Sequence, residues 1–257
     1  MDYLVQNEKW WDARVSAGHQ WTQPVGPEII EQAKAGSWSI VLTPTKPVPR
    51  EWFPADLHGV KVLCLASGGG QQAPVLAAAG AEVVVFDLSE KQLEQDLYVA
   101  SRDNLSVTAV KGNMTDLHAF ADGSFDLIVH PVSNMYVEDV SLVWKEAYRV
   151  LRSGGSLLTG FVNPLVYIFD PEKECENILE VAYSIPYSDL TSLPKDVLAM
   201  YIESGDPLLF GHSLEEQIGG QLKAGFMISG MYEDNYGGRR LLDRYINTFV
   251  ATKAVKP

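Results

Sequence analysis

The sequence predicts an α/β fold, a three-layer sandwich whose sheet is mostly parallel. Two observations predict it. Between residues 57 and 160, short apolar runs alternate with segments of helical periodicity, a pattern typical of parallel strands with helices on both faces. After residue 225, two more apolar runs follow with only a short polar connection between them, so they can pair antiparallel. We therefore expect seven strands and an antiparallel C-terminal strand.

Length and composition limit the class of protein. The 257 residues fit one domain with a full core. The net charge of −13 disfavours a nucleic-acid ligand, and two cysteines make neither a disulfide framework nor a zinc set. The start MDYLVQNEKWW does not resemble a signal peptide, and no apolar run approaches the ~18 residues of a membrane span. We expect a cytoplasmic protein.

Residues 1–56 form the first predicted unit, an N-terminal cap segment. They hold five of the six tryptophans, and helices are expected near 6–17 and 27–35. The proline-rich stretch 43–49 suits neither a helix interior nor a central strand. The tryptophans either pack this segment onto the sheet or line a pocket. In the pocket interpretation, Trp21 or His19 would lie near the reactive end. We expect packing for most of the tryptophans, with one or two in the pocket.

The predicted strands are apolar runs bounded by turn residues: 60–66, 82–87, 106–110, 125–130, 156–162, 226–232 and 247–254. Ser89 and Gln92 form a capping box that opens a helix with Leu93, Leu97 and Ala100 on its apolar face. The next helix covers 139–151.

A second capping box, Ser213 with Glu216, opens the last predicted helix. Leu214, Ile218 and Leu222 give that helix an apolar stripe, and Gly225 ends it.

A glycine turn follows the first strand, and an acid ends the second. Gly68 to Gly70 precede a helix, and Asp87 comes 17 residues later. Glycines allow a ligand close to the backbone, and a carboxylate there can accept hydrogen bonds from ribose hydroxyls. The plain alternative is a tight turn and a solvated acid. Gly68-x-Gly70-x-x-Ala73 also matches the dinucleotide fingerprint, so an NAD-dependent oxidoreductase stays an alternative from this segment.

Four stretches carry a family resemblance. Residues 62–70, VLCLASGGG, resemble the first motif of class I S-adenosylmethionine-dependent methyltransferases, usually VLDLGCGTG, and 85–89 resemble the second. Residues 111–129 resemble the GDAEDLP…DGSFDVV stretch, and 148–158 resemble the RVLKPGG turn. The most similar group is the small-molecule type, such as the ubiquinone/menaquinone biosynthesis methyltransferases (methyltransferase type 11 domain). The resemblance implies a Rossmann-like methyltransferase domain over 57–257.

The resemblance also implies site residues. S-adenosylmethionine would be the cofactor, and its candidate contacts are Ala66, Gly68, Gly70, Asp87, Leu88, Asn113, Met114 and His130. Three positions depart from the family: Cys64 stands for a common acid, Ala66 for glycine and Asn113 for aspartate. An asparagine oxygen can still accept from an amino group. These departures leave a catalytically silent S-adenosylmethionine-binding protein as a further alternative.

Methyl transfer from a sulfonium is an in-line displacement that needs alignment and exclusion of water. No obligatory triad is expected, and the five histidines show no metal-ligand spacing. His130 is the one weak candidate for a base, and a hydrogen-bonding role toward the cofactor is the favoured interpretation. Asn134 and Tyr136 are expected pocket walls.

A lid-like insertion is expected at about 161–212. Tyr167, Phe169, Tyr183 and Tyr187 offer aromatic surface to a small-molecule acceptor. Residues 161–210 carry nine acidic and two basic side chains. A solvated lid exterior is the usual meaning of such an excess, and a cationic substrate is the alternative.

Overall fold

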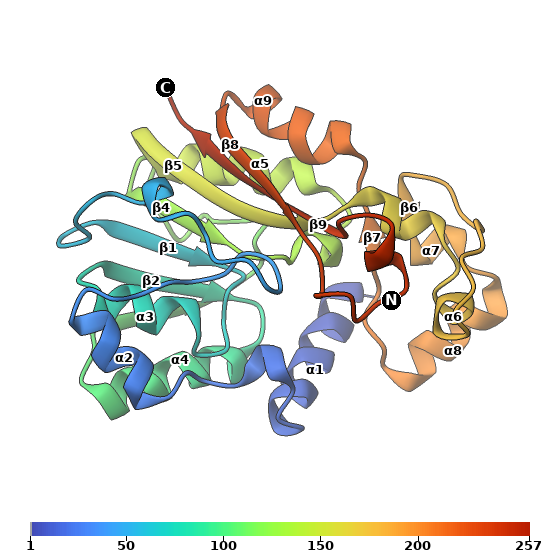
Figure 1. Cartoon of the computed structure of the whole chain (residues 1–257), viewed down its shortest axis with the longest axis horizontal. Coiled ribbons are helices and arrows are strands. Elements are labelled where there is room, and N and C mark those ends of the chain that lie inside the picture. The colour runs from blue at the N-terminus through green and yellow to red at the C-terminus, as the bar shows by residue number, and fades with distance from the viewer. Residues whose placement is uncertain (1) are drawn as a thin grey trace.

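The computed structural model describes residues 2–257, so Met1 of the predicted cap lies outside the described residues. Seven strands form one sheet in the order β3-β2-β1-β4-β5-β9-β8 (Figure 1). β9 pairs antiparallel with β5 and β8, and the remaining pairs are parallel. The strands are β1 Lys61–Leu65, β2 Glu82–Asp87, β3 Val107–Lys111, β4 Phe125–His130, β5 Leu151–Val162, β8 Met227–Asp234 and β9 Phe249–Val255. The predicted fold class is confirmed.

Helices cover both faces of this sheet. α2 (Pro27–Lys34), α3 (Gln72–Ala78) and α4 (Glu90–Asp103) share one core with Val62 and Cys64 of β1. α5 (Val140–Val150) and the segment around α9 (Gly220–Ala224) share the other core with Leu63 and Leu65. The two cores follow from the alternation of side chains along a strand that is buried on both faces.

The inner face of α4 differs from the predicted one. Leu97 is 44% exposed, whereas Asp96 is fully buried together with Leu93, Val99 and Ala100. The helix is therefore rotated so that the carboxyl group of Asp96, and not Leu97, faces inward. The reason is a hydrogen bond from the glycine turn to Asp96, at 3.0 Å between Gly69 N and Asp96 Oδ2.

The last helix also departs from its predicted stripe. The Ser213–Glu216 capping box forms, with Glu216 N donating to Ser213 Oγ at 3.2 Å and Ser213 N donating to Glu216 Oε2 at 2.8 Å. A π-helical turn over Glu215–Gly219 then precedes α9. Leu214 and Leu222 are more than half exposed, while Gln217 and Gln221 are buried. The glutamines face inward because they bond to buried polar partners, as Thr252 Oγ1 does to Gln221 Oε1 at 3.0 Å.

The elements of residues 161–212, called the lid, gather at the right in Figure 1, and α1 of the N-terminal segment lies at the lower centre. α1 covers Tyr3–Ser16, and the lid comprises α6 (Pro171–Cys175), β6 (Tyr187–Ser188), α7 (Asp189–Ser192), α8 (Lys195–Ser204) and β7 (Phe210–Gly211). Asn7 joins the two segments, since its Nδ2 donates to Leu208 O at 3.2 Å and its Oδ1 accepts from Leu208 N at 2.9 Å. Short 3-10 turns occur at 20–22, 50–52, 134–136, 164–168 and 242–244. Within residues 2–257, no helix has the length and apolarity to cross a membrane.

Candidate active site

A cavity of about 750 Å³ lies where the carboxyl ends of β1 and β2 meet the cap and the lid. Its size falls in the upper part of the usual range for small-molecule sites, about 300–1,000 Å³. Six of the eight predicted cofactor contacts line it: Ala66, Gly68, Asp87, Leu88, Asn113 and Met114. Gly70 and His130 are not among its lining residues.

The turn after β1 is shaped by close contacts. A Cβ on Gly68 would lie 2.7 Å from Gln92 Cβ, so a larger residue would displace α4. A Cβ on Gly70, which has φ of +73°, would lie 2.9 Å from Gln95 O. The absence of a side chain at Gly70 therefore lets the turn pack closely against α4. Ala66 has φ of +47°, in the left-handed region that costs a non-glycine residue about 1–3 kcal/mol and that persists mainly at functional sites.

Asp87 is held rigidly at the end of β2. Its Oδ2 accepts from Gly68 N at 2.9 Å and its Oδ1 accepts from Ser89 N at 2.9 Å. Burial raises the pKa of Asp87, while the amides of Ser89, Gly68 and Leu88 act in the opposite direction. Each carboxylate oxygen can accept a further hydrogen bond, so the group can still receive two ligand hydroxyls.

Gln92 is a site residue that the sequence reasoning treated only as a capping partner. Its N donates to Ser89 Oγ at 3.2 Å, as in a capping box. In a full capping box the Ser89 amide would donate to the Gln92 side chain, but here it donates to Asp87. Gln92 Oε1 is left buried with no hydrogen-bond partner within residues 2–257, and Gln92 lines the cavity. The sequence did hold a signal for this role of Gln92: Asp87, two residues before the Ser89 cap, is an acceptor that can compete for the Ser89 amide.

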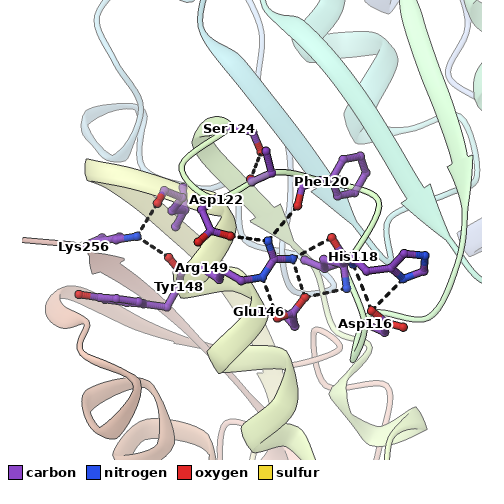
Figure 2. A network of polar contacts seen from close by, with 12 residues as sticks. Asp116, His118, Phe120, Asp122, Ser124, Glu146, Tyr148, Arg149 and Lys256 are labelled. Atoms are coloured by element: carbon purple, nitrogen blue, oxygen red, sulfur yellow. Dashed lines mark hydrogen bonds and ion pairs between the residues drawn. The ribbon is translucent and has the colours of Figure 1, made fainter.

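Asn113 and Met114 reach the cavity on the loop after β3, and Arg149 of α5 holds that loop (Figure 2). Arg149 Nη2 donates to Leu117 O at 2.9 Å, and Nη1 donates to Phe120 O and to Asp122 Oδ1, both at 2.8 Å. Arg149 also forms a bidentate pair with Glu146, which lowers the pKa of the Glu146 carboxyl. One guanidinium thus fixes the loop to α5.

His130 lies beneath the cavity wall and is fully buried. Its Nδ1 is 2.9 Å from Leu65 O and its Nε2 is 2.7 Å from Asn134 Oδ1, so both ring nitrogens are engaged. Asn134 continues the network by donating to Gln217 Oε1 at 2.9 Å. Burial lowers the pKa of His130, while the contacts with Leu65 and Asn134 act in the opposite direction. This geometry suits a residue that orients the end of β1, and it places no free imidazole nitrogen at the cavity.

The cap and the lid supply the outer walls. Trp10, Trp11 and Trp21 line the cavity, one tryptophan more than expected, and His19 also lines it. Trp38 and Trp52 pack elsewhere, against Phe53 at 5.0 Å and Tyr232 at 5.3 Å between ring centroids. The remaining predicted aromatic walls, Tyr136, Tyr167, Phe169, Tyr183 and Tyr187, all line the cavity, whereas Asn134 does not.

Comparison with known proteins decides the family. A family model described as a methyltransferase domain matches residues 63–159. The uncharacterized methyltransferase YbaJ of Bacillus subtilis (strain 168) is 56% identical over 253 residues, which cover 98% of each chain. The chain belongs to this methyltransferase family. Membership favours a methyltransferase over the oxidoreductase that the glycine pattern at 68–73 also allowed.

Solved structures share the fold of this methyltransferase. The S-adenosylmethionine-dependent methyltransferase from Mesorhizobium loti gives a TM-score of 0.57 at 19% identity, covering 80% of this chain and 94% of that one. Geranyl diphosphate C-methyltransferase from Streptomyces coelicolor A3(2), solved with S-adenosyl-L-homocysteine, gives 0.60 at 15% identity, covering 100% and 99%. The second similarity extends over the cap and lid as well as the sheet.

Proposed function

We propose that this methyltransferase transfers a methyl group from S-adenosylmethionine to a small-molecule acceptor by in-line displacement. One observation carries the proposal. The Asp87 carboxylate is fixed at the end of β2 and faces a cavity of about 750 Å³ closed by aromatic residues of the cap and lid. A carboxylate in that position can accept both hydroxyls of a ribose.

The residues around Asp87 fit the remaining parts of S-adenosylmethionine. Leu88 and Met114 offer apolar walls to an adenine, and the amide of Asn113 can meet its amino group. The buried Gln92 Oε1, which has no partner within residues 2–257, supplies an acceptor for a ligand donor. Gly68 leaves the backbone open to close approach. Gly70 and His130 act indirectly, by shaping the turn and the end of β1.

S-adenosylmethionine, when bound, supplies an electrophilic methyl group on a good leaving group. The protein then has to hold the acceptor in line and keep water out. The cap (residues 2–56) and the lid (residues 161–212) provide this enclosure, with Trp11 and Trp21 from the cap and Tyr167 and Tyr187 from the lid. His130 is not assigned as a base because both of its ring nitrogens are engaged.

Calorimetry tests the proposal directly. We expect S-adenosylmethionine and S-adenosyl-L-homocysteine to bind the full chain and NAD not to bind. NAD binding without S-adenosyl binding would overturn the assignment in favour of an oxidoreductase.

A catalytically silent binding protein is distinguished by turnover. Radiolabelled methyl transfer is measured with a panel of phenols, amines, thiols and acidic carbon compounds. Tight S-adenosylmethionine binding without transfer to any member of the panel would contradict the enzymatic part of the proposal.

A further inference from the structure

The lid end of the cavity holds a buried carboxylate that the methyl-donor site does not use. Asp189, the first residue of α7, is 3% exposed and lines the cavity. Its Oδ2 accepts from Leu209 N at 2.7 Å and its Oδ1 accepts from Tyr187 Oη at 2.6 Å. Within residues 2–257 no lysine, arginine or histidine forms a salt bridge with Asp189.

Aromatic rings surround this carboxylate. Tyr187 stacks on Tyr167, with ring centroids 5.6 Å apart and an interplanar angle of 22°. Tyr183 meets Tyr187 edge to face at 5.2 Å. All three rings line the cavity, as does Tyr201 of α8. Rings arranged around an anionic group are the usual surroundings of a bound ammonium ion, which is attracted to the ring faces and to the carboxylate together.

The charges near these rings are predominantly negative. Asp189 contributes to raising the pKa values of Tyr183 and Tyr201, after the larger effect of burial, and Glu172 acts on both in the same direction. The cavity also has two arginines, but Arg240 is bound to Glu174, with Nε 3.2 Å from Oε1, and Arg239 is exposed.

A purely structural role does not require a charge at position 189. The hydrogen bonds to Leu209 N and Tyr187 Oη could be made by a neutral amide or hydroxyl, whereas a buried carboxylate without a cation carries a desolvation cost. Burial does raise the pKa of Asp189. A cation bound beside it would offset that cost.

From this arrangement, and resting on the proposed methyltransferase function, we propose that the acceptor carries a cationic ammonium group. The group binds at the lid end of the cavity, between the rings of Tyr167, Tyr183 and Tyr187 and the carboxylate of Asp189. The acceptor class is thus a protonated amine or a quaternary ammonium compound with an apolar body, because the walls between this end and Asp87 are mainly aromatic and aliphatic. The cationic nitrogen serves for binding only, since it has no lone pair, and a separate nucleophilic atom of the acceptor takes the methyl group.

The test compares three probes of similar shape: 2-phenylethylammonium, 2-phenylethanol and 3-phenylpropanoate. Each is titrated calorimetrically into the full chain saturated with S-adenosyl-L-homocysteine. We expect the cation to bind at least about tenfold more tightly than the alcohol, the scale of a desolvated cation–π and carboxylate contact. The carboxylate probe should bind most weakly.

Two variants and a control locate the effect. Asp189→Asn keeps the acceptor for Leu209 N and should remove the preference for the cation. Tyr183→Leu leaves Asp189 and its bonds in place and should weaken the cation about three- to tenfold. Glu203→Gln removes one negative charge from an exposed position of α8 and should leave the preference intact. Near-ultraviolet circular dichroism and the melting temperature report whether each variant is folded.

Several results would overturn the proposal. They are equal affinity for cation and alcohol, no binding of any probe to the unmodified chain, or a cation preference that survives in a folded Asp189→Asn variant. Tighter binding of the carboxylate probe would also overturn it and would point to Arg239 and Arg240. Binding of S-adenosyl-L-homocysteine is measured first. If it fails, the proposed function fails; if it succeeds without probe discrimination, only the ammonium site fails.

Discussion

Asp96 Oδ2 accepts a hydrogen bond from Gly69 N at 3.0 Å, although Asp96 lies on α4 and Gly69 in the turn after β1. The family usually has an acid in the first motif, where this chain has the buried, neutral Cys64. Burial raises the pKa of the Cys64 thiol, and Asp96 raises it further. A carboxyl group on the neighbouring helix therefore binds the glycine turn in a chain whose β1 lacks that acid.

Replacing Asp96 by Asn should change how stability depends on pH. Burial raises the pKa of Asp96 to about 8, with the amides of Gly70 and Gly69 opposing. The folded state thus binds a proton that the unfolded state releases near pH 4, so the free energy of unfolding falls as the pH rises from about 4 to about 8. Asp96→Asn lacks this fall. Between pH 5 and pH 8, the free energy of unfolding of the variant should therefore rise relative to that of the unmodified chain. The total rise is about 1.4 kcal/mol for each unit by which folding raises the pKa of Asp96.

Urea unfolding at several pH values measures this difference. Asp56→Asn is the control, because Asp56 is exposed and its pKa is lowered by hydrogen bonds from His58. Parallel curves for Asp96→Asn and the unmodified chain would show that Asp96 is ionised in the folded protein.

Replacing Asp87 by Ala should weaken the binding of S-adenosyl-L-homocysteine by about 2–3 kcal/mol. This is the scale of a lost pair of charge-assisted hydrogen bonds. The variant also frees the amides of Gly68 and Ser89, so its folding is checked by circular dichroism. Calorimetry gives the affinity, with Asp56→Ala as the exposed control. A loss of binding free energy below about 0.5 kcal/mol would show that Asp87 does not bind the ribose.

Replacing Arg149 by Met should destabilise the fold and weaken cofactor binding together. Arg149 is partly exposed, so we expect a loss of about 1–3 kcal/mol in stability, less than for a fully buried ion pair. Affinity for S-adenosyl-L-homocysteine should fall as well, because Asn113 and Met114 are on the loop that Arg149 holds.

Arg152→Met is the matched control for Arg149. Arg152 pairs with Asp126 but is 58% exposed, so its loss should cost less than about 1 kcal/mol and leave affinity unchanged. If both arginine variants bind the cofactor as the unmodified chain does, the loop does not depend on Arg149.

Replacing His130 by Gln should remove part of the protein's sensitivity to acid. Burial lowers the pKa of His130, so below about pH 6.5 the unfolded state takes up a proton that the folded state does not. The stability of the unmodified chain therefore falls as the pH drops below this value, and this contribution is absent in His130→Gln. Unfolding at pH 7.5 and pH 5.5 measures it. If both proteins lose the same stability between pH 7.5 and pH 5.5, His130 is not a buried neutral imidazole.

The sequence by itself determined the order of the elements and most of the residues that line one end of the cavity. Alternating apolar runs predicted the parallel strands, because strands buried on both faces need continuous apolar sequence. The glycine turn at 68–70 and Asp87 could be read locally, since each belongs to one strand end and its following loop. Six of the eight residues predicted around this turn line one cavity for that reason.

Only the tertiary structure decided which polar side chains face inward. Periodicity placed Leu97 and Leu222 in the core, but the helices turn Asp96 and Gln221 toward buried partners instead. His130 looked like a candidate for the reaction, yet its nitrogens are engaged by groups brought together by the sheet.

The lid end of the cavity shows the same limit most clearly. Asp189 accepts a hydrogen bond from Leu209, twenty residues away, and lies beside the rings of Tyr183 and Tyr187 in a cavity that Asp87 also lines. Composition could report that the lid is acidic, but not that one of its carboxylates is buried without a basic partner within residues 2–257. Local patterns encode strands and turns, whereas desolvation and long-range hydrogen bonds depend on where the folded chain places each group.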